Sequence, residues 1–166
     1  MRRGVERPSA DGIQDPGKQR ASKVRKPTPL AVGALQNGTV HPVAIAAALV
    51  AAAIHVWIFA LESLWFMRPA VYRRFGIASE EQASVVRSFA YNQGFYNLFL
   101  AIGVAAGLGL LATDNVAAAS ALVLFACGSM VAAGVVLVTH NRAFARAAAV
   151  QAVPPLVAIV SLLALR

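Results

Sequence analysis

Long apolar runs separated by short polar breaks make up most of the chain. Four of these runs are long enough to be membrane-spanning helices, because a helix needs about 20 mostly apolar residues to cross a hydrocarbon core of roughly 30 Å. The pattern predicts spans at about 43–66, 80–112, 116–139 and 147–165. The sequence therefore predicts an all-α polytopic membrane protein, a four-transmembrane-helix bundle over residues 43–166.

Several residues mark where the predicted helices begin or bend. Pro42 suits the first turn of a helix, and Ser79 followed by Gln82 fits a capping box at the start of the second span. From there the helical pattern continues for about 32 residues or ~48 Å, so the first turns should lie in the membrane interface. Pro154 and Pro155 should kink the fourth span.

Small residues in spans two and three are candidates for close helix contacts. Gly103 and Gly107 form a GxxxG pair, and Ala126, Gly128 and Gly134 recur in span three. Such residues let helix backbones approach each other in lipid. Chance is the alternative explanation, because alanine and glycine are abundant throughout these spans.

Residues 1–42 form a basic segment of different composition. They hold eight of the fifteen lysines and arginines of a chain with net charge +8. Pro8, Pro16, Pro27 and Pro29 lie among these basic residues, and together with a lack of aromatic residues they predict a disordered arm. Its natural partner is an anionic lipid surface, at about 1 kcal/mol per basic residue; a solvated extension without a partner is the alternative. Nucleic acid is not expected, because the basic residues do not cover a folded face.

The composition agrees with a membrane location. Hydrophobic residues make up 58% of the 166 residues and charged residues 13%, whereas soluble domains carry about 25% charged residues. The lipid bilayer is thus the expected environment, and the expected localisation is the cell (plasma) membrane, multi-pass. The single cysteine, Cys127, excludes disulfide frameworks and cysteine metal sites. No metal or cofactor is predicted, and a homo-oligomer stays open.

The orientation in the membrane is ambiguous from charge. The arm and Arg166 together carry nine basic residues on one side, against six in the loops after spans one and three. Counting only residues close to a span reverses the balance to four against six, which slightly favours an outside N-terminus. In that orientation the eight basic residues of the arm would have to cross the membrane, which is unfavourable. If the start codon is placed too far upstream, the arm is not part of the protein and this difficulty disappears.

Ionisable residues inside a span are functional candidates, because placing them there is costly. Span one contains His55 and Glu62, seven residues or two helical turns apart, which predicts a shared helix face at a separation of about 10.5 Å along the axis. Glu62 is the only acid at membrane depth. It lies toward the first loop, at the end of the span.

Further polar side chains should gather at the same depth. Span two enters from that loop, and up-down threading returns the end of span three, with His140, to the same side. The first membrane-level polar residues of span two are Asn92, Gln93, Tyr96 and Asn97. We expect a polar pocket open to one leaflet.

The cluster has two interpretations. In the functional one, Glu62 exchanges a proton with a ligand or with His55. In the structural one, Glu62, Asn92, Gln93 and Asn97 form a satisfied hydrogen-bond network that joins the first two helices. For His55 and Tyr96 taken alone, a structural role is favoured.

Two aromatic residues flank the first loop. Trp65 and Tyr72 are predicted to be anchors at the membrane interface, where amphipathic rings are enriched.

The residues of this region resemble those of a known family. The similarity is carried by the run from Ile54 to Glu62, Trp65, Phe75-Gly76, the run Asn92-Gln93-Gly94-Phe95-Tyr96-Asn97, and Leu100-Ala101. They resemble a bacterial family of small four-span membrane proteins known as domain of unknown function thirteen-zero-four, over about residues 43–165. The resemblance implies four membrane helices and no established activity. The basic arm departs from the family, whose members usually begin almost at the first span.

These features favour a membrane protein that binds a small or lipid-like ligand in the one-leaflet pocket. A proton-coupled transporter component and a structural or accessory membrane subunit are the alternatives. No phosphate-binding loop, metal-ligand spacing or nucleophile elbow supports a named reaction, so a non-enzymatic function is favoured without being decided.

Overall fold

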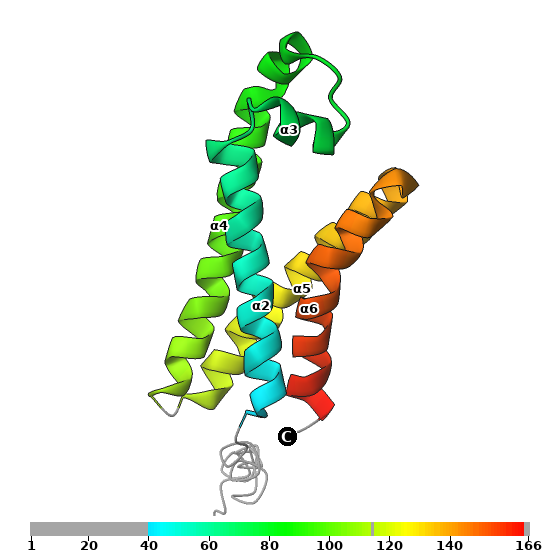
Figure 1. Ribbon diagram of the computed structural model, residues 1–166. Helices are drawn as coiled ribbons and strands as arrows, with labels where there is room; N and C mark the ends of the chain where they lie inside the picture. The colour runs from blue at the N-terminus through cyan, green and yellow to red at the C-terminus, as the bar shows by residue number, and fades with distance from the viewer. Residues whose placement is uncertain (1–39, 114, 165–166) are drawn as a thin grey trace, which may run out of the picture.

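The structure is a computed structural model that describes residues 40–113 and 115–164. Four long helices run in alternating directions (Figure 1): α2 (Pro42–Phe59), α4 (Glu80–Leu111), α5 (Val116–His140) and α6 (Ala145–Ala164). With the short turns that extend two of them, all four are long and apolar enough to cross a membrane. The predicted all-α four-span fold is confirmed. All but the last three residues of the predicted arm lie outside the described residues.

Short helical turns connect or extend the long helices. Helix α2 continues into a π-helical turn, η2 (Ala60–Leu64), so this span ends two residues before its predicted end. Between the first two spans lie α3 (Pro69–Tyr72) and the 3-10 turn η3 (Arg73–Phe75), and the 3-10 turn η4 (Arg142–Phe144) precedes α6.

Side-chain caps explain where two of the helices begin. Ser79 Oγ accepts a hydrogen bond from the Gln82 backbone N–H at 3.3 Å, as in a capping box. The side chain of Gln82 accepts from the N–H of Ala78 at 3.2 Å, one residue before the cap. Helix α5 begins in the same manner, with Asn115 Oδ1 accepting from Ala118 N–H.

Two glycines allow direct contact between helix backbones. A Cβ atom on Gly107 of α4 would lie 3.2 Å from the carbonyl oxygen of Ala119 on α5. A Cβ on Gly134 of α5 would lie 2.7 Å from Ala152 Cβ and 3.2 Å from the Ala148 oxygen on α6. These are the close approaches that small residues permit in lipid.

The other two candidate glycines contribute less. A Cβ on Gly103 would meet Ala126 Cβ at 3.5 Å, an ordinary van der Waals distance, and one on Gly128 would meet nothing within 4 Å. Gly128 therefore does not serve the close contact that its position in span three suggested.

The main core contains mostly small side chains from all four long helices. These buried residues are Ala44, Ala48, Ala51, Val104, Val123, Ala126, Cys127, Met130, Ala158 and Leu162. A second, smaller cluster forms beyond the end of the first span, where Phe66 and Tyr72 pack on Ala83 at the start of α4. The prediction that Tyr72 anchors in the interface is wrong, because its ring is buried in this cluster.

The helices diverge at the end opposite the described chain ends. There the hairpin of α5 and α6 leans away from α2 and α4 (Figure 1). The last buried residue of α5 is Gly134, although the helix continues to His140. The connection between α5 and α6 still contacts the loop after the first span. There the Phe144 ring lies 3.6 Å from the position that a Cβ atom on Gly76 would take.

The two adjacent prolines lie inside α6. The helix continues through Pro154 and Pro155, and Figure 1 shows it changing direction between its upper and lower parts. A proline lacks the N–H that would bond the preceding turn and its ring crowds that turn, which bends a helix.

Cys127 gives a direct test of the core. Its side chain is 0% exposed, so we expect N-ethylmaleimide to react with it on the order of a hundredfold more slowly in nanodiscs than in denaturing detergent. A Cys127→Ala variant carrying Ser84→Cys, at an exposed position on α4, is the accessible control. Equal rates for Cys127 and for the control would contradict the packing of α5.

Candidate functional site

The site begins with the π-helical turn that ends the first span. The Trp65 N–H donates to the Ala60 carbonyl at 2.9 Å, a bond over five residues rather than four. Each residue of a π-turn rotates less about the helix axis than a residue of an α-helix. His55 lies in α2 and Glu62 lies in the π-turn, so their separation of seven residues no longer places them on the same helix face. The prediction that His55 and Glu62 share a face assumed α-helical geometry throughout.

Glu62 meets α4 through a hydrogen bond. Asn97 Nδ2 donates to Glu62 Oε2 at 2.9 Å and to the carbonyl oxygen of Gln93 at 3.1 Å. The Asn97 side chain is only 9% exposed, so its amide is held by the packing and by both acceptors. This contact between the first two spans was expected from the sequence.

The second carboxylate oxygen of Glu62 is in a different situation. Within the described part of the chain, Oε1 takes part in no hydrogen bond or ion pair. No buried side-chain oxygen or nitrogen there lacks a partner, so Oε1 is not completely buried. The carboxylate is thus fixed at one oxygen and open at the other.

Gly94 allows the π-turn to approach α4 closely. A Cβ on Gly94 would collide with Ser63 Oγ and would lie 3.1 Å from both Glu62 Cβ and Ser63 N. Ser63 Oγ donates to the Tyr91 carbonyl oxygen at 2.9 Å, a second bond between the elements. Sequence reasoning missed Ser63 and the role of Gly94; the only available signal was a small residue inside a polar run.

The other predicted site residues do not join Glu62. His55 is 1% exposed, and because a carbonyl can only accept, its Nδ1–H donates to the Ala51 oxygen at 2.8 Å. Asn92, Gln93 and Tyr96 expose their side chains on α4. His140 is exposed at the end of α5.

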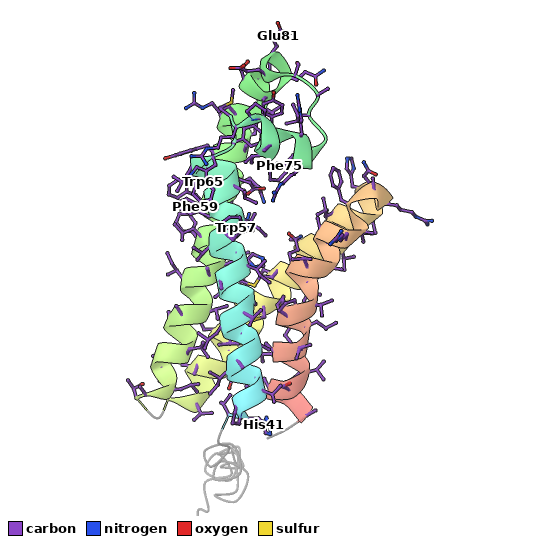
Figure 2. All side chains as sticks on the ribbon, viewed as in Figure 1. His41, Trp57, Phe59, Trp65, Phe75 and Glu81 are labelled. Atoms are coloured by element: carbon purple, nitrogen blue, oxygen red, sulfur yellow. The ribbon has the colours of Figure 1, made fainter. Side chains whose placement is uncertain are left out.

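Aromatic rings surround the same end of the first span. Trp57 and Trp65 meet edge to face with ring centres 5.5 Å apart, and Phe59 meets Phe95 of α4 at 5.1 Å. Figure 2 shows Trp57, Phe59 and Trp65 together at this end of the helix. The Arg68 guanidinium lies over the Trp65 ring at 5.2 Å from its centre, a cation–π contact.

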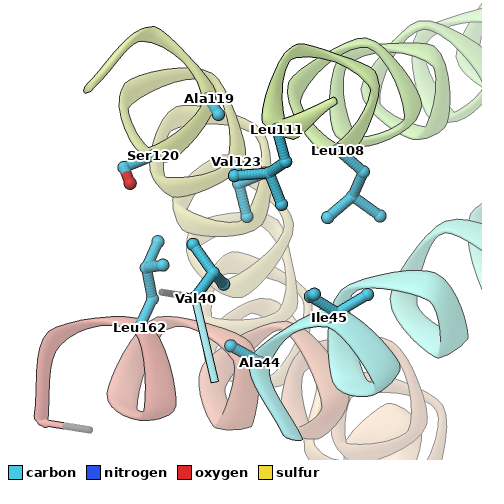
Figure 3. A pocket seen from close by; sticks show the side chains of 9 residues that line it. All are labelled: Val40, Ala44, Ile45, Leu108, Leu111, Ala119, Ser120, Val123 and Leu162. Atoms are coloured by element: carbon cyan, nitrogen blue, oxygen red, sulfur yellow. The ribbon is translucent and has the colours of Figure 1, made fainter. Parts of the chain in front are cut away.

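An apolar pocket lies at the opposite end of the bundle. Figure 3 shows its lining side chains, which come from all four long helices and from Val40. Its volume is about 10 Å³, which is near the minimum for one water molecule. Ser120 is the one polar residue among those that line it. This pocket is therefore remote from Glu62 and too small for an organic ligand.

The described residues contain no group of three His, Cys, Asp or Glu side chains that could hold a metal ion. The polar chemistry at this end of the bundle is that of one carboxylate, one buried amide and the exposed polar groups of α4.

Comparison with curated proteins found no match, and comparison with solved structures found none. One family model matches the chain, that of a protein of unknown function, DUF1304, over residues 49–163. The match includes the π-turn, the loop and most of all four long helices. The chain belongs to the DUF1304 family of proteins of unknown function.

Proposed function

We propose that this membrane protein binds a small or lipid-like ligand at the Glu62–Asn97 site, near one membrane face. The observation that carries the proposal is the open Oε1 atom of a carboxylate whose other oxygen is fixed by a buried amide. A preorganised polar group that keeps a free acceptor is suited to orient a ligand, because the protein has already ordered it before binding.

An ionisable acid at position 62 exceeds what a helix contact requires. A glutamine side chain offers the same acceptor to Asn97 Nδ2 without the cost of placing an ionisable group at membrane depth. A contact that only joins two helices does not need the acid. The ionisable acid and its unpartnered oxygen together therefore favour ligand binding over a purely structural role.

The first test compares co-purified molecules in the wild type and in Glu62→Gln. We expect native mass spectrometry of protein released from nanodiscs to show a bound species in the wild type and at least about tenfold less in the variant. Because glutamine keeps the bond to Asn97, the midpoint of thermal unfolding should shift by no more than ~4 °C. The matched control is Glu81→Gln, at an exposed acid on the first turn of α4.

A structural role predicts the reverse result. If neither protein carries a bound species, the Glu62–Asn97 bond is only a helix contact and the proposal fails, whatever the stability of Glu62→Gln. Asn97→Leu shows how large a stability loss the broken contact causes. It removes the buried donor and should lower the free energy of unfolding by about 1–3 kcal/mol whichever role is correct.

A further inference from the structure

Glu62 has no charged partner among the described residues. The acids nearest in sequence, Glu80 and Glu81, lie in the first turn of α4, beyond the predicted hydrocarbon core. Within the described residues no lysine, arginine or histidine pairs with the Glu62 carboxylate, whose one polar partner is the neutral amide of Asn97. An anion in a poorly solvated place gains most from a ligand that brings the opposite charge.

The aromatic rings nearby are suited to the same kind of ligand. One face of the Trp65 ring is occupied by the Arg68 guanidinium, so Trp57 offers the freer aromatic surface. The Trp57 ring, in contact with Trp65, is 52% exposed. Aromatic faces attract cations electrostatically and also bury apolar groups.

The order of charges disfavours a zwitterionic phospholipid. Glu62 lies within the span, and three arginines follow it beyond the end of the helix, all of them exposed: Arg68, Arg73 and Arg74. In a bilayer the phosphate of such a lipid lies nearer the hydrocarbon core than its amine does. A bound phospholipid would then place its phosphate toward Glu62 and its amine toward the arginines, so both contacts would be repulsive.

We infer that the ligand is a lipophilic organic cation, a substituted ammonium or phosphonium ion whose charge pairs with Glu62 Oε1 and whose apolar groups lie on the exposed ring of Trp57. This inference rests on the proposed function and specifies its ligand class. The carboxylate pairs with the positive charge of the ligand, and the aromatic surface buries its apolar groups. A hydrated inorganic cation has no apolar groups and would gain nothing from that surface.

The probe for this inference is tetraphenylphosphonium, titrated into protein in phosphatidylcholine nanodiscs and measured by equilibrium dialysis. We expect saturable binding to the wild type and a dissociation constant at least about tenfold higher for Glu62→Gln. Glu62→Asp retains the charge and should bind more tightly than Glu62→Gln, while Glu81→Gln should match the wild type. Triphenylphosphine oxide, a neutral probe of similar shape, should not distinguish the variants.

Tryptophan fluorescence reports on the probe, because the chain has two tryptophans and their rings are in contact at the end of the first span, where Glu62 lies (Figure 2). Emission should change on binding in the wild type, and in Glu62→Gln only at probe concentrations at least about tenfold higher. Equal affinity of the wild type and Glu62→Gln for the phosphonium would overturn the inference. If mass spectrometry still shows a Glu62-dependent neutral or anionic species, the proposed function stands without the cation; if it shows none, both fail.

Discussion

Gly94→Val is expected to lower the free energy of unfolding by about 3 kcal/mol, at the upper end for overpacking. Even the first added atom would collide with Ser63 Oγ and lie 3.1 Å from Glu62 Cβ and Ser63 N. The hydroxyl can rotate away, but the backbone nitrogen cannot, so the π-turn must move from α4. That movement would also break the Glu62–Asn97 bond, and ligand binding should be lost together with stability. Unfolding in mixed micelles, followed by circular dichroism, measures the loss.

The same helix offers a matched control for this substitution. A Cβ on Gly109 would meet nothing within 4 Å, so Gly109→Val should leave stability within about 0.5 kcal/mol of the wild type. If both valine variants unfold at the same detergent fraction as the wild type, the close approach at Gly94 is wrong. If both are equally destabilised, the effect belongs to valine in α4 and not to the contact.

Gly134→Ala is expected to cost about 2 kcal/mol, although alanine is the better helix former by up to ~1 kcal/mol. The added methyl would lie 2.7 Å from Ala152 Cβ and 3.2 Å from the Ala148 carbonyl oxygen. Neither atom belongs to a side chain that can rotate away, so α5 and α6 must separate. The same mixed-micelle unfolding measures the change, and Gly128→Ala on α5, with open space at its Cβ, should be neutral or slightly stabilising.

A second substitution tests the cause of that loss. In the double variant Gly134→Ala with Ala152→Gly, the methyl group changes sides and the closest clash disappears. We expect it to recover more than half of the stability lost in the single variant, after correction for the glycine added to α6. A double variant as unstable as the sum of the two single ones would show that the 2.7 Å contact does not govern this interface.

The spans and their beginnings were predictable because the signals are local. Apolar runs of sufficient length must form helices in lipid, where unpaired backbone groups are too costly. The cap at Ser79 and the contact role of Gly107 likewise follow from short motifs. Glycine at Gly128 has similar sequence surroundings and makes no such contact, because composition alone does not fix which face of a helix meets its neighbour.

The candidate site was predictable only in part. Antiparallel threading sufficed to bring Glu62 and Asn97 to one depth, and the structure joins them. The same argument grouped His140 with them, but depth is not proximity: α5 diverges from α2 and α4 at that end and leaves His140 exposed (Figure 1). Tyr72 was predicted to lie in the interface from its residue type alone, whereas in the structure its ring packs in a hydrophobic cluster.

The sequence by itself determined the number of spans, their approximate ends and the depth of each polar residue, since hydropathy and length act along the chain. Tertiary structure decided which way those residues face. The π-turn at Ala60–Leu64 has no signature that sequence reasoning used; it forms where Glu62 and Ser63 gain bonds to α4 and Gly94 leaves room for them. One additional residue per turn changes the rotation of everything beyond it, and only packing against a neighbouring helix selects that geometry.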